Sequence, residues 1–200
     1  MLKITHIAHA CFLIENSKER LIIDPYHSDM GYEPIKETVN YILISHNHPD
    51  HNCTDGITLK ENIGSFKIST VDSFHDNENG NLRGPNIIHI IDTEDTRICH
   101  LGDLGHKLTD EQLKLMRDID VLLIPVGGFY TIDYQMAIEV ISQLNPMLVI
   151  PMHYKTSDKI KSNVNFIDNF IENIKGYKVI KSENNQLDYT KPSEKTVLVI

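Results

Sequence analysis

The stretch YILISHNHPDH, residues 41–51, decides the fold of this chain. Its first four residues run without a polar interruption, which is typical of a β-strand buried on both faces. Four side chains of metal-ligand type follow within six residues: His46, His48, Asp50 and His51. In extended backbone His46 and His48 project to the same side, and Pro49 then restricts the chain so that the last two ligands emerge elsewhere. One short loop can therefore serve two adjacent metal ions.

The composition indicates a globular chain with a sizeable core. It has 200 residues, 40% hydrophobic and 24% charged, which predicts a single domain over residues 1–200. No apolar stretch reaches the ~18–20 residues of a membrane span. The net charge of −9 argues against nucleic acid or anionic lipid as a partner. We expect a small-molecule substrate, no nucleic acid or membrane partner, and leave a homo-oligomer open.

Cysteine and histidine usage adds two expectations. The three cysteines are scattered and odd in number, which suggests a reducing compartment and a cytoplasmic location. The 11 histidines outnumber the 8 tyrosines. Such an excess is what a metal site requires, and bound divalent cations would offset part of the negative charge.

Hydrophobic patterning predicts a layered α/β architecture. Strands are expected at residues 3–7, 11–15, 20–24, 41–45, 66–69, 86–91, 97–101, 121–125, 147–151, 177–181 and 196–200. Helices are expected at residues 110–118, 132–144 and 165–174. The charges at residues 159–161 are expected to be solvated surface.

The motifs around residues 46–51 resemble those of the metallo-β-lactamase superfamily along essentially the whole chain. They are HACFLIE (9–15), IIDP (22–25), SFHD (73–76), LGDLGH (101–106), PVGG (125–128) and IPMHY (150–154). The set is similar to the zinc-dependent hydrolase branch that includes ascorbate-6-phosphate lactonase-like proteins and N-acyl-phosphatidylethanolamine phospholipase D. The motifs are specific for the superfamily and not for a substrate.

The resemblance implies an α/β fold, a four-layer αββα sandwich of two mixed β-sheets flanked by helices. It also implies a set of site residues: His46, His48 and His75 for a first metal ion, Asp50, His51 and His153 for a second, Asp103 as the bridge between them, and Asp24 as a support. Two divalent metal ions follow, with Zn expected and Fe or Mn as alternatives, since imidazole and carboxylate suit all three.

The function that the resemblance implies is a binuclear metal-dependent hydrolase. A metal-bridging hydroxide would cleave a small ester or lactone, with or without a phosphate group, and Asp50 would pass the proton. Candidate substrate contacts are Arg83, His106, Tyr130 and Tyr154. The alternatives are a metal-dependent phosphodiesterase and a non-hydrolytic metal-binding protein of the same fold. His9 and His100 are interpreted as structural, with support of the ligands as the alternative.

Overall fold

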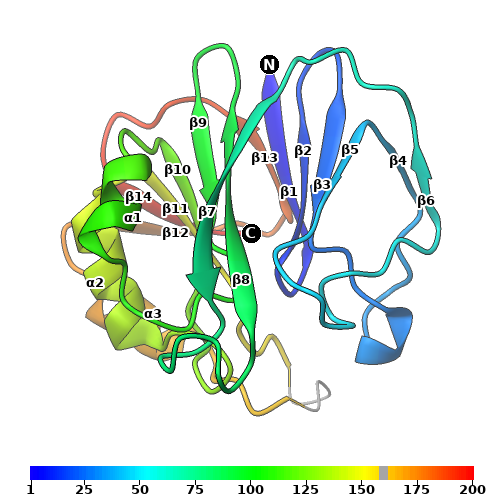
Figure 1. The fold of residues 1–200 in the computed structure, drawn as a ribbon. Helices are drawn as coiled ribbons and strands as arrows, with labels where there is room; N and C mark the ends of the chain where they lie inside the picture. The colour runs from blue at the N-terminus through cyan, green and yellow to red at the C-terminus, as the bar shows by residue number, and fades with distance from the viewer. Residues whose placement is uncertain (158–161) are drawn as a thin grey trace.

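Two mixed β-sheets pack face to face in the computed structural model, which describes residues 1–157 and 162–200 (Figure 1). The five-stranded sheet has the order β13 (Gln186–Tyr189), β1 (Leu2–Ala8), β2 (Cys11–Glu15), β3 (Arg20–Ile23) and β5 (Tyr41–Leu43). The seven-stranded sheet has the order β12 (Lys178–Lys181), β14 (Thr196–Val199), β11 (Leu148–Met152), β10 (Val121–Pro125), β9 (Arg97–His100), β8 (Pro85–Asp92) and β7 (Lys67–Phe74). The predicted sandwich of two mixed sheets is confirmed. The predicted charges at residues 159–161 lie outside the described residues.

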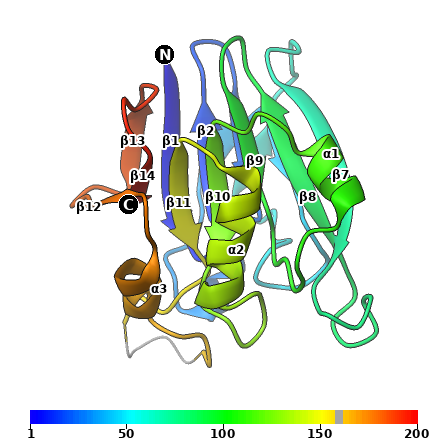
Figure 2. The ribbon, with the colours of Figure 1, turned by 90° about the vertical axis from the view of Figure 1, so that its left-hand side faces the viewer.

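Three helices cover the outer face of the seven-stranded sheet (Figure 2). They are α1 (Asp110–Leu115), α2 (Tyr134–Leu144) and α3 (Asp168–Asn173). The capping box predicted from Thr109 and Gln112 is present at α1. Helix α2 begins two residues later than expected, because Asp133 caps it by accepting the Met136 backbone N–H. In the described part of the chain no helix is long and apolar enough to cross a bilayer.

Among the described residues, no α-helix covers the outer face of the five-stranded sheet. A short 3₁₀ turn, η1 (Ser28–Met30), and a two-stranded sheet of β4 (Glu37–Val39) and β6 (Ile57–Leu59) lie there instead (Figure 1). Val39 and Ile35 from this segment are buried against the sheet residues Cys11 and Ile22. Within residues 1–157 and 162–200, α-helices therefore flank only the seven-stranded sheet, which refines the predicted four-layer arrangement.

Two of the continuous apolar strands, β10 and β11, are buried on both faces as the sequence indicates, whereas the prediction is wrong for β5, an edge strand whose residues are only partly buried. Every residue of β10 and of β11 is buried. Along β10, alternate side chains pack on the helices, as Leu122 does, or on the other sheet, as Leu123 does. This double coverage fixes the position of the strand ends that carry functional side chains.

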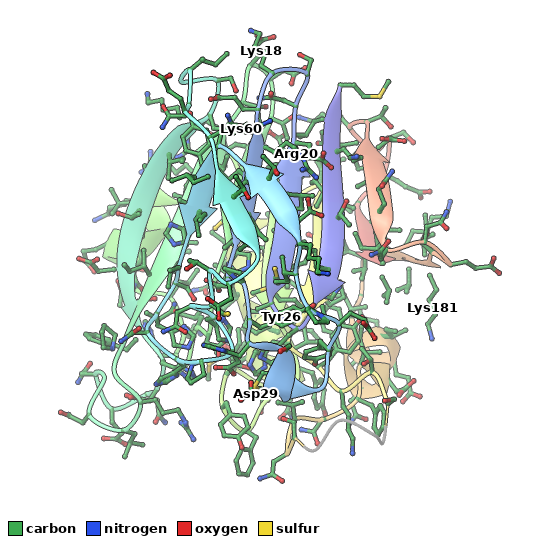
Figure 3. The ribbon with its side chains drawn as sticks, turned by 90° about the vertical axis from the view of Figure 1, so that its right-hand side faces the viewer. Lys18, Arg20, Tyr26, Asp29, Lys60 and Lys181 are labelled. Atoms are coloured by element: carbon green, nitrogen blue, oxygen red, sulfur yellow. The ribbon has the colours of Figure 1, made fainter. Side chains whose placement is uncertain are left out.

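Strands of both sheets deliver polar side chains to one edge of the sandwich. Strands β1, β3 and β5 are mutually parallel, and so are β7, β9 and β11. The residues that follow their carboxyl ends are His9, Asp24, His46, His75, Asp103 and His153. In Figure 3 this edge is the lower one, on the side of the labelled Tyr26 and Asp29 and opposite the labelled Lys18.

The opposite edge is held by a buried carboxylate. Glu19 accepts hydrogen bonds from the Ser65 backbone N–H at 2.6 Å and from the Tyr41 hydroxyl at 3.2 Å, and also from the Ile63 backbone N–H. These bonds outweigh the effect of burial and lower the pKa of Glu19. This edge is therefore stabilised by protein groups alone.

Gly105 allows the loop after β9 to approach the end of β7. Its N–H donates to the Phe74 carbonyl at 2.9 Å, and an added Cβ would lie 2.2 Å from the Asp76 nitrogen and 2.4 Å from the His75 carbonyl carbon. This close approach brings Asp103 to His75.

Gly105→Ala is expected to separate these loops, because backbone atoms on both sides would have to move. We expect a loss of roughly 1–3 kcal/mol in the free energy of unfolding, together with reduced metal content. Denaturant unfolding and elemental analysis measure both effects. Ser142→Ala, at an exposed position on α2, is the control, and wild-type values for Gly105→Ala would contradict this reading of the contact.

Candidate metal centre

Asp24 organises the loop that follows β5. Its Oδ1 accepts the Ser45 backbone N–H at 2.7 Å, and its Oδ2 accepts the Ser45 hydroxyl at 2.7 Å and lies 3.0 Å from His51 Nδ1. Ser45 Oγ in turn lies 2.9 Å from His46 Nδ1. Because each imidazole is held through Nδ1, its Nε2 is left to face the site.

A first ligand group comprises His46, His48 and His75, whose candidate ligand atoms all lie within 4.8 Å of one another. The ring centroids of His46 and His48 are 4.6 Å apart, and those of His46 and His75 are 4.7 Å apart. Burial, followed by the neighbouring His51, lowers the pKa of His46 to about 3. A neutral imidazole is the form that binds a metal.

The loop that carries His75 is built around the buried carboxylate of Asp76. Its Oδ1 accepts the backbone N–H groups of residues 78 and 80, and its Oδ2 accepts those of Leu82 and Arg83. These bonds overcome the effect of burial and bring the pKa of Asp76 to about 2. His75 and Arg83 are thus presented by one internally bonded loop, residues 75–84.

A second ligand group lies beside the first: His9, Asp50, His51 and His153, again with all candidate atoms within 4.8 Å of one another. His51 Nε2 is 3.6 Å from Asp50 Oδ2, and His9 Nε2 is 3.3 Å from the same oxygen. Burial and the neighbouring His153 lower the pKa of His9 to about 4. The sequence analysis gave His9 no ligand role.

Asp103 lies between the two groups. Its Oδ2 is 3.0 Å from His75 Nε2, 3.2 Å from His153 Nε2 and 3.3 Å from His51 Nε2. The backbone N–H of Asp103 donates to Asn86 Oδ1, which fixes the residue at the end of β9. Although burial favours the neutral acid, His153 and His51 hold the pKa of Asp103 well below its usual range.

The donor set fits divalent metal ions. Buried polar atoms without a hydrogen-bond partner include Nε2 of His9, His46 and His51 and Oδ1 of Asp103. Such atoms are costly to bury unless something compensates them. Imidazole nitrogens and carboxylate oxygens in this number are suitable ligands for Zn, Fe or Mn.

A cavity of about 410 Å³ opens onto both ligand groups. Arg83 and Tyr130, two of the four candidate substrate contacts, line it, and Met30 and Tyr32 line it as well. The last two were missed because they lie on the segment between β3 and β4, where the sequence shows no motif.

Two predicted substrate contacts lie outside this cavity. His106 Nε2 accepts the Phe74 backbone N–H at 3.1 Å, and its Nδ1 lies 2.8 Å from the Lys107 carbonyl. Tyr154 is buried in the core under the helices, where burial raises its pKa to about 12. The predicted substrate contacts His106 and Tyr154 are thus engaged with the protein itself, His106 with neighbouring backbone and Tyr154 with the core.

Comparisons with known proteins agree with this geometry. A family model described as the beta-lactamase superfamily domain matches residues 3–153. The chain is 32% identical to a UPF0173 metal-dependent hydrolase of Nanoarchaeum equitans, with 81% of this chain and 88% of the relative covered. It is 28% identical to a protein of the same name from Desulforamulus reducens, with 96% and 98% covered.

A solved structure is similar over the full length. It is a Thermotoga maritima protein assigned to the zinc-dependent hydrolases of the metallo-β-lactamase superfamily, with a TM-score of 0.81 and 33% identity. The comparison covers 100% of this chain and 98% of that one.

Asp24→Asn is expected to weaken metal binding without unfolding the chain. An amide offers one acceptor oxygen where the carboxylate offers two, so it cannot accept the Ser45 backbone N–H on one side and hold His51 and the Ser45 hydroxyl on the other. Loss of such an orienting partner typically costs about 10- to 100-fold in metal affinity. Competition with a chelator measures this, and the exposed Asp72→Asn is the control. Equal affinities in wild type and Asp24→Asn would show that the imidazoles align without this carboxylate.

Proposed function

This chain belongs to the beta-lactamase superfamily and to its UPF0173 metal-dependent hydrolases, and we propose that it holds two metal ions and cleaves a small ester or lactone. The observation that carries the proposal is the position of Asp103. One of its oxygens faces imidazoles of both ligand groups. A carboxylate so placed can bind two ions at once.

Bound divalent ions would lower the pKa of water and polarise the substrate oxygen. Asp50 Oδ2 then accepts the proton of the attacking water. The nearby imidazoles of His9, whose Nε2 lies 3.3 Å from Asp50 Oδ2, and of His51 outweigh burial and keep the pKa of Asp50 below its usual range, so the carboxylate is ionised. The side chain is 26% exposed, which leaves it open to the cavity.

Arg83 supplies a contact for an anionic substrate. Its guanidinium lies over the Tyr130 ring, 5.9 Å from the centroid, and one nitrogen donates to the Phe129 carbonyl at 3.1 Å. Arg83 lines a cavity whose size suits a small molecule. A carboxylate or phosphate distant from the cleaved bond fits this arrangement.

The metal identity, the cellular location and the binding partners are further parts of this proposal. Zn is the expected metal, with Fe or Mn as alternatives. The three cysteines are free and buried, in keeping with the predicted cytoplasmic location. A small-molecule substrate, with neither nucleic acid nor membrane as partner, remains our prediction, and so does a branch kinship with the lactonase-like proteins.

Asp103→Asn is expected to lose at least one of the two ions and most of the activity, because an amide cannot supply two anionic oxygens to two metals. Elemental analysis should give about two ions per wild-type chain. A panel of lactones, carboxylate esters, thioesters and phosphodiesters measures turnover. Phosphodiesters as the preferred substrates would favour the alternative activity, and metal content without turnover on any of them would favour a non-hydrolytic protein.

Arg83→Ala is expected to raise KM for anionic substrates and leave metal content and kcat nearly unchanged, since the contact is equal in the ground and transition states. The expected loss is roughly 1.5–3 kcal/mol, or about ten- to a hundredfold in kcat/KM. Paired substrates with and without the anionic group measure it, with Arg117→Ala, outside the cavity, as control. An equal loss on both members of a pair would assign Arg83 to loop structure.

A further inference from the structure

We propose that His9 is a further protein ligand of the second metal position, beside Asp50, His51 and His153. That position would then be filled by the protein, and the substrate would bind at the first. The inference rests on the proposed binuclear function. It adds a ligand from the turn that directly follows β1.

The position of the His9 ring supports this role. Its centroid lies 4.1 Å from that of His153 and 5.2 Å from that of His51. Nε2 is buried and has no hydrogen-bond partner, although it is 3.3 Å from Asp50 Oδ2. All four candidate ligand atoms lie within 4.8 Å of one another, which is compatible with a single ion at about 2.0–2.2 Å from each donor after small adjustments.

Two neighbouring histidines show what a purely structural role looks like here. His6 has both ring nitrogens at hydrogen-bond distance from backbone carbonyls, those of Ile200 and His9. His100 lies 2.9 Å from the Ala10 carbonyl through Nε2 and accepts the Gly102 N–H through Nδ1. His9 is as buried as these residues, yet its Nε2 points at the metal ligands instead.

The backbone holds His9 in this orientation. Its φ is +57°, in the left-handed region that a histidine seldom adopts. The His9 carbonyl accepts the backbone N–H of His153 at 3.0 Å, so the end of β1 is tied to the end of β11. Strained backbone of this kind persists where the surroundings enforce it, and here it turns the imidazole into the site.

The assignment makes the two positions unequal. The first would have three imidazoles and a shared oxygen of Asp103. The second would have three imidazoles and the carboxylates of Asp50 and Asp103. A substrate oxygen would therefore bind at the first position, whose ligand His75 directly precedes the loop carboxylate Asp76 that holds the Arg83 backbone.

His9→Asn tests the inference. Asparagine tolerates positive φ, so the backbone can persist, while its shorter side chain cannot reach the ion. Met30→Ala is the matched control, because Met30 lines the same cavity and is not a predicted ligand. Wild type and both variants are loaded with Co²⁺, and metal affinity is measured by titration. Paramagnetically shifted imidazole N–H signals in the proton NMR spectrum count the histidines bound.

The inference expects two ions in wild type and signals from six histidines, those of the two ligand groups. In His9→Asn one histidine signal disappears and one of the two ions binds at least about tenfold more weakly, while Met30→Ala matches wild type. Two bound ions with five histidine signals in both wild type and His9→Asn would overturn the inference. His9 would then be a neighbour of Asp50 that does not bind metal, and the proposed function would be unaffected. A single ion in wild type would overturn the binuclear proposal itself, and this inference with it.

Discussion

The burial of the Asp103 carboxylate among imidazoles is the constraint on which this end of the molecule depends. An ionised group removed from water is costly unless opposite charge and hydrogen bonds compensate it. Here one oxygen faces Nε2 atoms on three sides, and the other has no partner. Protonation of the imidazoles could balance the negative charge, but the protons would then occupy the Nε2 lone pairs that face the site. Divalent cations satisfy the carboxylate and the lone pairs together.

A small set of backbone devices makes this cluster possible. Three of the residues involved, His9, Asp24 and His153, have positive φ, and Gly105 permits a contact that no larger residue could make. His9, Asp24 and His153 each follow the end of a strand, β1, β3 or β11, and Gly105 lies in the loop after β9. The packing of the sheets thus compensates the conformational strain of the backbone at the strand ends. A site of this kind can therefore be both strained and well positioned.

The sequence predicts much of this, for identifiable reasons. The four ligand-type residues between positions 46 and 51 form a recognisable motif, and apolar runs such as β10 can be identified from their hydrophobicity. The structure brings the predicted metal ligands together. Strands β4, β6 and β13 were missed, because they are short, partly polar and stabilised only by their partners. A ligand role for His9 could not be predicted from the sequence either, because a single histidine after a strand is not part of a ligand-spacing pattern. The predicted cavity position of His106 was wrong, because the direction of its side chain depends on the conformation of the loop after β9, which residue type alone does not determine.

The two ends of the sandwich are held together by different means. At one end Glu19 joins its neighbours through hydrogen bonds that form whenever the chain folds. At the other, segments from residue 9 to residue 153 meet around groups that repel or leave each other unpaired without cations. Bound cations would therefore act as a removable cross-link between the sheets, closing chain loops that span most of the molecule. Loss of these cations would then open the site edge of the molecule before its core unfolds, so cellular metal supply would determine local order there.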